Sequence, residues 1–128
     1  MKNINIIRYG KNPIVSGGLH SWRRAGSFNP AVIYDGGKFY MLERAIQSIR
    51  PFICNFGLLV SDNGFDFRPA QDSPVFTANE LGYPQGTVED PRLIKSENRF
   101  LLTYAYRPYT YNCYPTGTGL PEYTPLVG

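Results

Sequence analysis

The chain contains few of the residues that build disulfide frameworks and metal sites. Its 128 residues include two cysteines and one histidine. Cys54 and Cys113 lack the spacing of metal ligands, so we expect two free thiols in a reducing compartment. With His20 as the single histidine, the sequence excludes a site built from several histidines, and we predict no metal.

Long apolar runs and a strong charge bias are also missing. No run of about 18 apolar residues occurs, so we expect no membrane-spanning helix. Residues 1–8 lack the apolar core of a signal peptide, which favours a cytoplasmic location. The net charge of +3, from 13 basic and 10 acidic residues, is too small and too evenly spread for a nucleic-acid partner. The doublet Arg23-Arg24 is interpreted as solvated surface.

Helix signals are scarce, whereas aromatic residues are abundant. Ten tyrosines and eight phenylalanines favour strands, and most are expected to pack within a sheet. Apolar runs separated by Gly, Asn and Asp predict three hairpins: residues 31–34 with 38–45, residues 56–60 with 65–67, and residues 92–95 with 99–106. After residue 108 no closing strand is evident. The sequence therefore predicts an all-β fold.

One segment of the chain is repeated. Residues 29–42 align with residues 90–103 without a gap, 61 positions apart, so that Asn29 matches Asp90 and Pro30 matches Pro91. A period built on strand, turn and strand is typical of a β-propeller. We expect about two blades, at about 25–75 and about 85–128, within one domain spanning 1–128. A propeller closes with about four to eight blades, so we expect part of a longer protein or, alternatively, an assembly of several copies.

The segment Glu89-Asp90-Pro91-Arg92 carries the clearest chemical signal. Two adjacent carboxylates precede a proline at the start of a predicted strand. The proline is expected to keep Asp90 out of helical geometry and to fix its presentation, and Arg92 could hold one carboxylate ionised. The alternative is an aspartate that caps a turn, beside a surface pair of Glu89 and Arg92. Asn29 taken alone also fits a turn residue.

Four motifs taken together resemble glycoside hydrolase family 130, the β-mannoside phosphorylases and related β-mannosidases. In chain order, across roughly residues 12 to 110, they are Phe28-Asn29-Pro30-Ala31, Leu42-Glu43-Arg44-Ala45, Ser61-Asp62-Asn63-Gly64-Phe65 and Val88-Glu89-Asp90-Pro91-Arg92. The resemblance implies a five-bladed β-propeller with its active site at the central axis. It covers the N-terminal part of the family fold, and the remaining phosphate ligands or glutamate bases of the family lie beyond it.

The resemblance also implies roles for particular residues. Asp90 matches the family's catalytic acid, and Asn29 and Arg44 match residues that bind the sugar in the −1 subsite. Arg50 stands where some phosphorylases place an arginine that contacts phosphate. Glu89 and Arg92 flank the acid and are assigned with it to the substrate site.

Two aromatic residues are further candidates for substrate binding. Trp22 and Tyr104 could stack on sugar faces, and for each the alternative is ordinary packing.

The implied reaction is inverting cleavage of a β-mannosyl oligosaccharide, with no cofactor. An acid protonates the leaving group, through the sugar's 3-hydroxyl in this family, while a nucleophile attacks the opposite face of the ring. Inorganic phosphate is the nucleophile, and a co-substrate, in phosphorylases. The acid should hold a proton near neutral pH, which burial and a neighbouring carboxylate such as Glu89 would promote. Alternatives are a non-catalytic carbohydrate-binding propeller fragment and an inactive truncated remnant.

Overall fold

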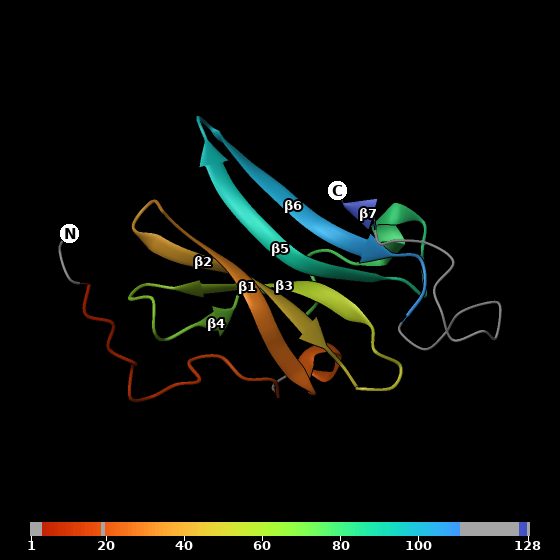
Figure 1. Ribbon diagram of the computed structural model, residues 1–128, viewed down its shortest axis with the longest axis horizontal. Coiled ribbons are helices and arrows are strands. Elements are labelled where there is room, and N and C mark those ends of the chain that lie inside the picture. Colours follow the sequence, from red (N-terminus) through yellow and green to blue (C-terminus); the bar gives the residue numbers. More distant parts are fainter. Residues whose placement is uncertain (1–3, 19, 111–125, 128) are drawn as a thin grey trace.

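The chain folds into two antiparallel sheets (Figure 1). The computed structural model describes residues 4–18, 20–110 and 126–127. The first sheet has the strand order β1-β2-β3-β4, and the second has the order β5-β6-β7. The strands are β1 (Gly26–Asp35), β2 (Lys38–Ile46), β3 (Cys54–Ser61), β4 (Arg68–Pro69), β5 (Thr87–Ser96), β6 (Arg99–Arg107) and β7 (Leu126–Val127). The prediction of an all-β fold is confirmed.

Helical structure in the described residues amounts to two single turns of 3-10 helix, η1 (Ser21–Arg23) and η2 (Ala78–Leu81). Thr77 caps η2: its side chain accepts from Asn79 N, while the Glu80 side chain reaches back to Thr77 N. This reciprocal capping satisfies backbone donors at the start of the turn. Across the part of the chain that the structure describes, no helix has the length and apolarity needed to cross a membrane.

The first and third predicted hairpins are confirmed. Strands β1 and β2 pair up to Asp35↔Lys38, which leaves Gly36 and Gly37 as a two-residue turn with φ of +55° and +81°. Turns of this kind need positive φ at both positions, which glycine adopts without steric cost. Strands β5 and β6 pair in the same way up to Ser96↔Arg99.

Two sequence expectations about strands are wrong. The return strand of the second hairpin is β4 at Arg68–Pro69 rather than residues 65–67. The reason is a side-chain-stabilised turn, in which Asn63 Oδ1 accepts from the backbone N–H groups of Phe65 and Asp66, both at 2.9 Å. The second sheet also has a third strand, since Leu126–Val127 pairs with β6.

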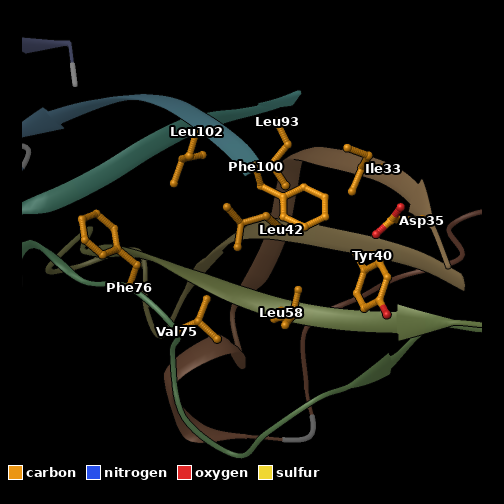
Figure 2. A pocket seen from close by; sticks show the side chains of 10 residues that line it. All are labelled: Ile33, Asp35, Tyr40, Leu42, Leu58, Val75, Phe76, Leu93, Phe100 and Leu102. Atoms are coloured by element: carbon orange, nitrogen blue, oxygen red, sulfur yellow. The ribbon is translucent and has the colours of Figure 1, made fainter. Parts of the chain in front are cut away.

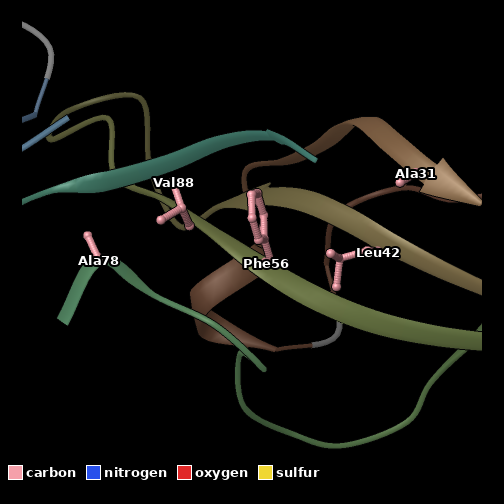
Figure 3. Close-up of a cluster of buried hydrophobic side chains, with 5 residues drawn as sticks. All are labelled: Ala31, Leu42, Phe56, Ala78 and Val88. Atoms are coloured by element: carbon pink, nitrogen blue, oxygen red, sulfur yellow. The ribbon is translucent and has the colours of Figure 1, made fainter. Parts of the chain in front are cut away.

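The hydrophobic core lies between the first sheet and β5 (Figure 3). Its fully buried members come from five different elements: Ala31, Leu42, Phe56, Ala78 and Val88. Phe56 and Val88 have no exposed surface, and burying a large apolar side chain contributes about 1.5–3 kcal/mol. This packing fixes β5 against β1, β2 and β3, which in turn places the residues at the starts of β1 and β5 near each other.

Arg23, in η1, packs against the first sheet and is buried, although the sequence predicted that it lies on the solvated surface. Arg23 is 3% exposed, and its guanidinium binds both oxygens of Glu43, at 2.7 and 2.9 Å, as well as Ser16 O at 3.2 Å. Interpreting Arg23 as solvated surface is therefore wrong, because β2 supplies a buried carboxylate that requires a cation. Arg24 is exposed, as expected.

The outer face of the second sheet exposes two apolar side chains that are cross-strand neighbours. Leu93 and Leu102 are directed at the first sheet, whereas their neighbours Ile94 and Leu101 are 60% and 47% exposed. Exposed apolar surface of this kind is typical of faces that pack against another element.

Candidate functional site

The two repeats carry the same irregularity at the same place. In β1 the register shifts between Phe28 and Ala31, and in β5 it shifts between Glu89 and Arg92. In each strand the Asn-Pro or Asp-Pro pair of the repeat lies opposite a single residue of the partner strand, so each bulge contains one extra residue. Bulges of this type redirect a side chain and are over-represented next to active sites.

The first residue of each bulge has a left-handed backbone. Asn29 has φ of +45° and Asp90 has φ of +52°. The following proline was expected to keep Asp90 out of helical geometry, and Asp90 does lie outside the right-handed helical region, but its positive φ was not predicted. Asn and Asp tolerate positive φ better than other non-glycine residues. Backbones held in sparsely populated regions cluster at functional sites, where packing over-determines them.

The two bulges bring their polar side chains into direct contact. Asn29 Nδ2 donates to Asp90 Oδ1 at 2.8 Å, and Arg44 Nη1 donates to the same oxygen at 2.9 Å. The structure thus brings together the predicted acid and both residues predicted to bind the sugar. The Asp90 side chain is 44% exposed, so an external ligand can reach it.

Arg44 is held on several sides. Its Nε donates to Cys54 Sγ at 3.1 Å, and its Nη2 lies 3.2 Å from Glu89 Oε2. The guanidinium carbon lies 4.9 Å from the ring centre of Phe28 and 5.9 Å from that of Phe52, within the range of cation–π attraction. Burial alone would lower the pKa of Arg44, but the interaction with Cys54, the charge of Glu89 and the hydrogen bond to Asp90 raise it above its ordinary value. Arg44 is therefore a permanent cation.

The pKa of Asp90 is lowered, not raised. The largest cause is the hydrogen bond from Asn29; partial burial opposes it, and the hydrogen bond and charge of Arg44 and the charge of Arg92 add to it. The expectation that surrounding groups keep Asp90 protonated near neutral pH is therefore wrong for this arrangement. Positive and donating groups outweigh burial, and Asp90 is a carboxylate.

Glu89 is enclosed rather than presented to a ligand. Its side chain is 6% exposed, and its carboxylate lies 3.2 Å from Arg44 Nη2 and 3.5 Å from Arg107 Nε. A carboxylate between two guanidinium groups compensates their charge within the protein. The assignment of Glu89 to direct substrate contact is therefore replaced by contact with Arg44.

Both aromatic candidates are engaged in packing. Trp22 lies so close to Gly57 that a β-carbon there would come within 2.4 Å of Trp22 Cη2, and its indole N–H donates to Asp72 O at 2.8 Å. Tyr104 makes edge-on contacts with Phe56 and Phe76, with ring centres 6.1 and 5.3 Å apart. The structure thus favours the packing alternative for both residues over stacking on a sugar.

The two remaining candidates lie on the surface. Arg92 is exposed and donates from Nη1 to Pro91 O at 2.8 Å, and its charge acts on Asp90. Arg50 is exposed, next to a cis bond to Pro51. A phosphate contact for Arg50 stays a prediction.

Several residues of the site were not identified from the sequence. Arg107 reaches Glu89 from the end of β6, and Phe28 and Phe52 flank Arg44. Cys54 was identified only as a free thiol; it is free and fully buried, and Cys113 lies outside the described residues. The one available signal was Phe28, which directly precedes the repeated Asn-Pro pair.

A cleft lies away from these residues (Figure 2). It has a volume of about 600 Å³ and opens between the two sheets, toward the hairpin turns. Apolar side chains such as Leu58, Phe76 and Phe100 dominate its walls, with Asp35 and Tyr40 at one end. A sugar requires several polar partners, so we assign the chemistry to the bulges and the cleft to incomplete packing between the sheets.

Comparison with known proteins supports the motifs found in the sequence. The β-1,2-mannobiose phosphorylase of Thermoanaerobacter sp. (strain X514) is 32% identical over 77% of this chain and 36% of its own length. The 1,2-β-oligomannan phosphorylase of the same organism is 35% identical over 66% of this chain and 30% of its own length. No family model matches the chain. The chain spans about a third of the length of these curated relatives.

A solved structure agrees on the fold. It comes from work on family 130, described as mannoside phosphorylases that include glycoside hydrolases targeting β-1,2-mannosidic linkages in Candida mannan. The match covers 94% of this chain and 35% of that one, with a TM-score of 0.60 and 22% identity. By sequence and by fold, the chain is a relative of the mannoside phosphorylases and glycosidases of glycoside hydrolase family 130, over about one third of their length.

Proposed function

We propose that this chain contributes the acid side of an active site that cleaves β-mannosides by inversion, within a five-bladed propeller. The observation that carries the proposal is the contact of Asn29 and Arg44 with one oxygen of Asp90, at 2.8 and 2.9 Å. The repeat of the bulge supports the propeller, because equivalent positions of successive blades converge on a common axis.

In this proposal Asp90 supplies the proton and its neighbours orient the sugar. An inverting enzyme protonates the leaving oxygen while a nucleophile attacks the anomeric carbon from the opposite face. Asn29 and Arg44 provide directed donors for sugar hydroxyl groups beside Asp90. The left-handed backbone at Asn29 and Asp90 fixes both side chains before the substrate arrives.

Phosphate is the nucleophile that this site favours. The lowered pKa of Asp90 is unfavourable for a general acid, which works best with a pKa near the operating pH. A phosphate anion bound near Asp90 would raise the pKa of Asp90 by like-charge repulsion. Both curated relatives reported above are phosphorylases. We therefore place phosphorolysis ahead of hydrolysis, with β-1,2-mannobiose as the first substrate to test.

The test is an assay of a completed protein. This chain replaces the matching third of the β-1,2-mannobiose phosphorylase, and the chimera is incubated with β-1,2-mannobiose, with and without phosphate. We expect phosphate-dependent release of mannose 1-phosphate and a loss of at least about 100-fold in kcat for Asp90→Asn. Glu97→Gln, at the exposed β5–β6 turn, is the matched control. Turnover that survives Asp90→Asn in a folded chimera would contradict the proposal.

A second candidate function is carbohydrate binding without turnover. It is supported by the partly exposed Asp90 carboxylate beside the donors Asn29 and Arg44, an arrangement that can bind sugar hydroxyl groups without any reaction. Calorimetric titration of this chain with β-1,2-manno-oligosaccharides separates the candidates. Binding that weakens in Asn29→Ala, with no activity in the chimera, supports the binding module. No binding and no activity supports an inactive remnant.

A further inference from the structure

The side chain of Arg44 is buried, but it contacts the partly exposed carboxylate of Asp90. One edge of its guanidinium faces Asp90, whose side chain is 44% exposed, while the Arg44 side chain itself is 8% exposed. A long side chain is fixed in one geometry only if several partners offset the loss of rotamer freedom. The partners away from Asp90 therefore decide where Nη1 is held.

Of these partners, Cys54 lies outside the repeat and the four motifs, whereas Glu89 directly precedes Asp90 in the fourth motif. Cys54 Sγ accepts from Nε at 3.1 Å, and Glu89 Oε2 lies 3.2 Å from Nη2. Because a guanidinium is planar, contacts at Nε and Nη2 determine the direction in which Nη1 points. Phe28 and Phe52 lie within cation–π range of the same group.

Cys54 and Glu89 are themselves fixed. Cys54 is fully buried, and its backbone N–H donates to Thr87 Oγ1 at 2.8 Å. Glu89 is held on its other side by Arg107, at 3.5 Å. Thr87 and Glu89 both belong to β5, the strand that carries Asp90. Through Cys54 and Glu89, Arg44 is therefore anchored to β5, the strand that carries Asp90.

We propose that Cys54 and Glu89 are positioning residues that aim Arg44 at Asp90. They act through Arg44 and contact neither the sugar nor the reacting atoms. The catalytic importance of this positioning rests on the proposed function. The positioning itself can be tested in the absence of substrate.

The experiment follows the carboxyl carbon of Asp90 by ¹³C NMR during a pH titration of this chain. The groups that face Asp90 are Asn29 from β1, Arg44 from β2, and Glu89 and Arg92 from β5. Cys54→Ala removes the acceptor at Nε without changing any charge. We expect the pKa of Asp90 to rise toward the ordinary aspartate value in Cys54→Ala and to return in Cys54→Ser, which restores an acceptor.

Three further variants keep the test decisive. Ser61→Ala, a fully buried position at the other end of β3, controls for general loosening and should leave the pKa of Asp90 unchanged. Glu89→Gln removes the charge but keeps an oxygen acceptor for Arg44, whereas Glu89→Ala removes both. Because both variants lose the same charge, a higher pKa of Asp90 in Glu89→Ala than in Glu89→Gln measures the loss of aim.

The outcomes separate the two proposals. An unchanged pKa of Asp90 in folded Cys54→Ala, or equal pKa values of Asp90 in Glu89→Ala and Glu89→Gln, would overturn the positioning role and leave the proposed function standing. If Cys54→Ala does not fold, the comparison of the two Glu89 variants decides. If the pKa of Asp90 responds as expected but the chimera shows no turnover, the proposed function is contradicted and the positioning role is not.

Discussion

Asn29 Nδ2 lies 2.8 Å from Asp90 Oδ1, although the two residues are 61 positions apart in the sequence. They occupy the same place in two copies of one structural unit, each at the first position of a bulge with a left-handed backbone. Each copy of the repeat thus contributes one polar residue to the site. The bulge in β1 redirects Asn29 and the bulge in β5 redirects Asp90. Because the core holds β5 against β1, the two side chains point toward each other.

The pKa of Asp90 makes the stability of the chain depend on pH. A carboxyl whose pKa is lower folded than unfolded contributes stability that is present above its unfolded pKa and lost as pH falls through its folded pKa. We expect the melting temperature of the wild type to exceed that of Asp90→Asn near neutral pH. The difference should shrink from about pH 5 downward. Thermal melts at a series of pH values, with Asp72→Asn as an exposed control, provide the measurement; a difference that grows in acid would contradict the sign.

The buried pair of Arg23 and Glu43 should dominate the stability of the first sheet. Their side chains are 3% and 1% exposed. Removing either partner leaves a buried charge without its counter-ion, which lowers the free energy of unfolding by about 3–5 kcal/mol. We expect Glu43→Ala to lower the free energy of unfolding by that amount in urea titrations. Arg24→Ala, the exposed neighbour, should change it by about 0.5 kcal/mol or less. Equal effects of the two changes would show that the pair is not buried in solution.

Gly57 is required by the position of Trp22. A β-carbon at this residue would lie 2.4 Å from Trp22 Cη2 and 2.7 Å from Glu43 Oε1. We expect Gly57→Ala to destabilise the chain by about 1–3 kcal/mol and to change the fluorescence of Trp22, the single tryptophan. Gly10→Ala, where a β-carbon meets nothing within 4 Å, is the control and should do neither. An unaltered Gly57→Ala protein would place Trp22 elsewhere, free to stack on a sugar.

The exposed apolar pair Ile94 and Leu101 on the second sheet should cause association of the isolated chain. Ile94 and Leu101 are 60% and 47% exposed on adjacent strands, and exposed faces of this kind recruit partners. We expect sedimentation velocity to show species larger than the monomer at high concentration, and the double change Ile94→Lys and Leu101→Lys to shift them toward the monomer. Arg99→Glu, at the β5–β6 turn, is a matched surface control. A wild-type chain that stays monomeric would contradict the expectation.

The sequence predicted that Asn29 and Asp90 occupy equivalent positions, because the repeat is visible in linear order, but it did not predict the hydrogen bond between them. It did not predict the left-handed backbone, because a residue before proline normally avoids it and only packing enforces it. It misjudged Arg23, whose carboxylate partner lies 20 residues away on a strand interior. Tyr104 and Trp22 showed the same limit: an aromatic residue suits a core or a sugar equally well, and only the neighbours decide.

The central claim is that Asn29 and Arg44 together hold Asp90 as a carboxylate at the junction of two equivalent bulges. The most direct measurement is the ¹³C titration of Asp90 in the wild type and in Asn29→Ala, with Asn98→Ala in the β5–β6 turn as control. The account predicts a wild-type pKa below the ordinary aspartate value, a rise in Asn29→Ala and no change in Asn98→Ala. A wild-type pKa at or above the ordinary value, unaffected by Asn29→Ala, would contradict it.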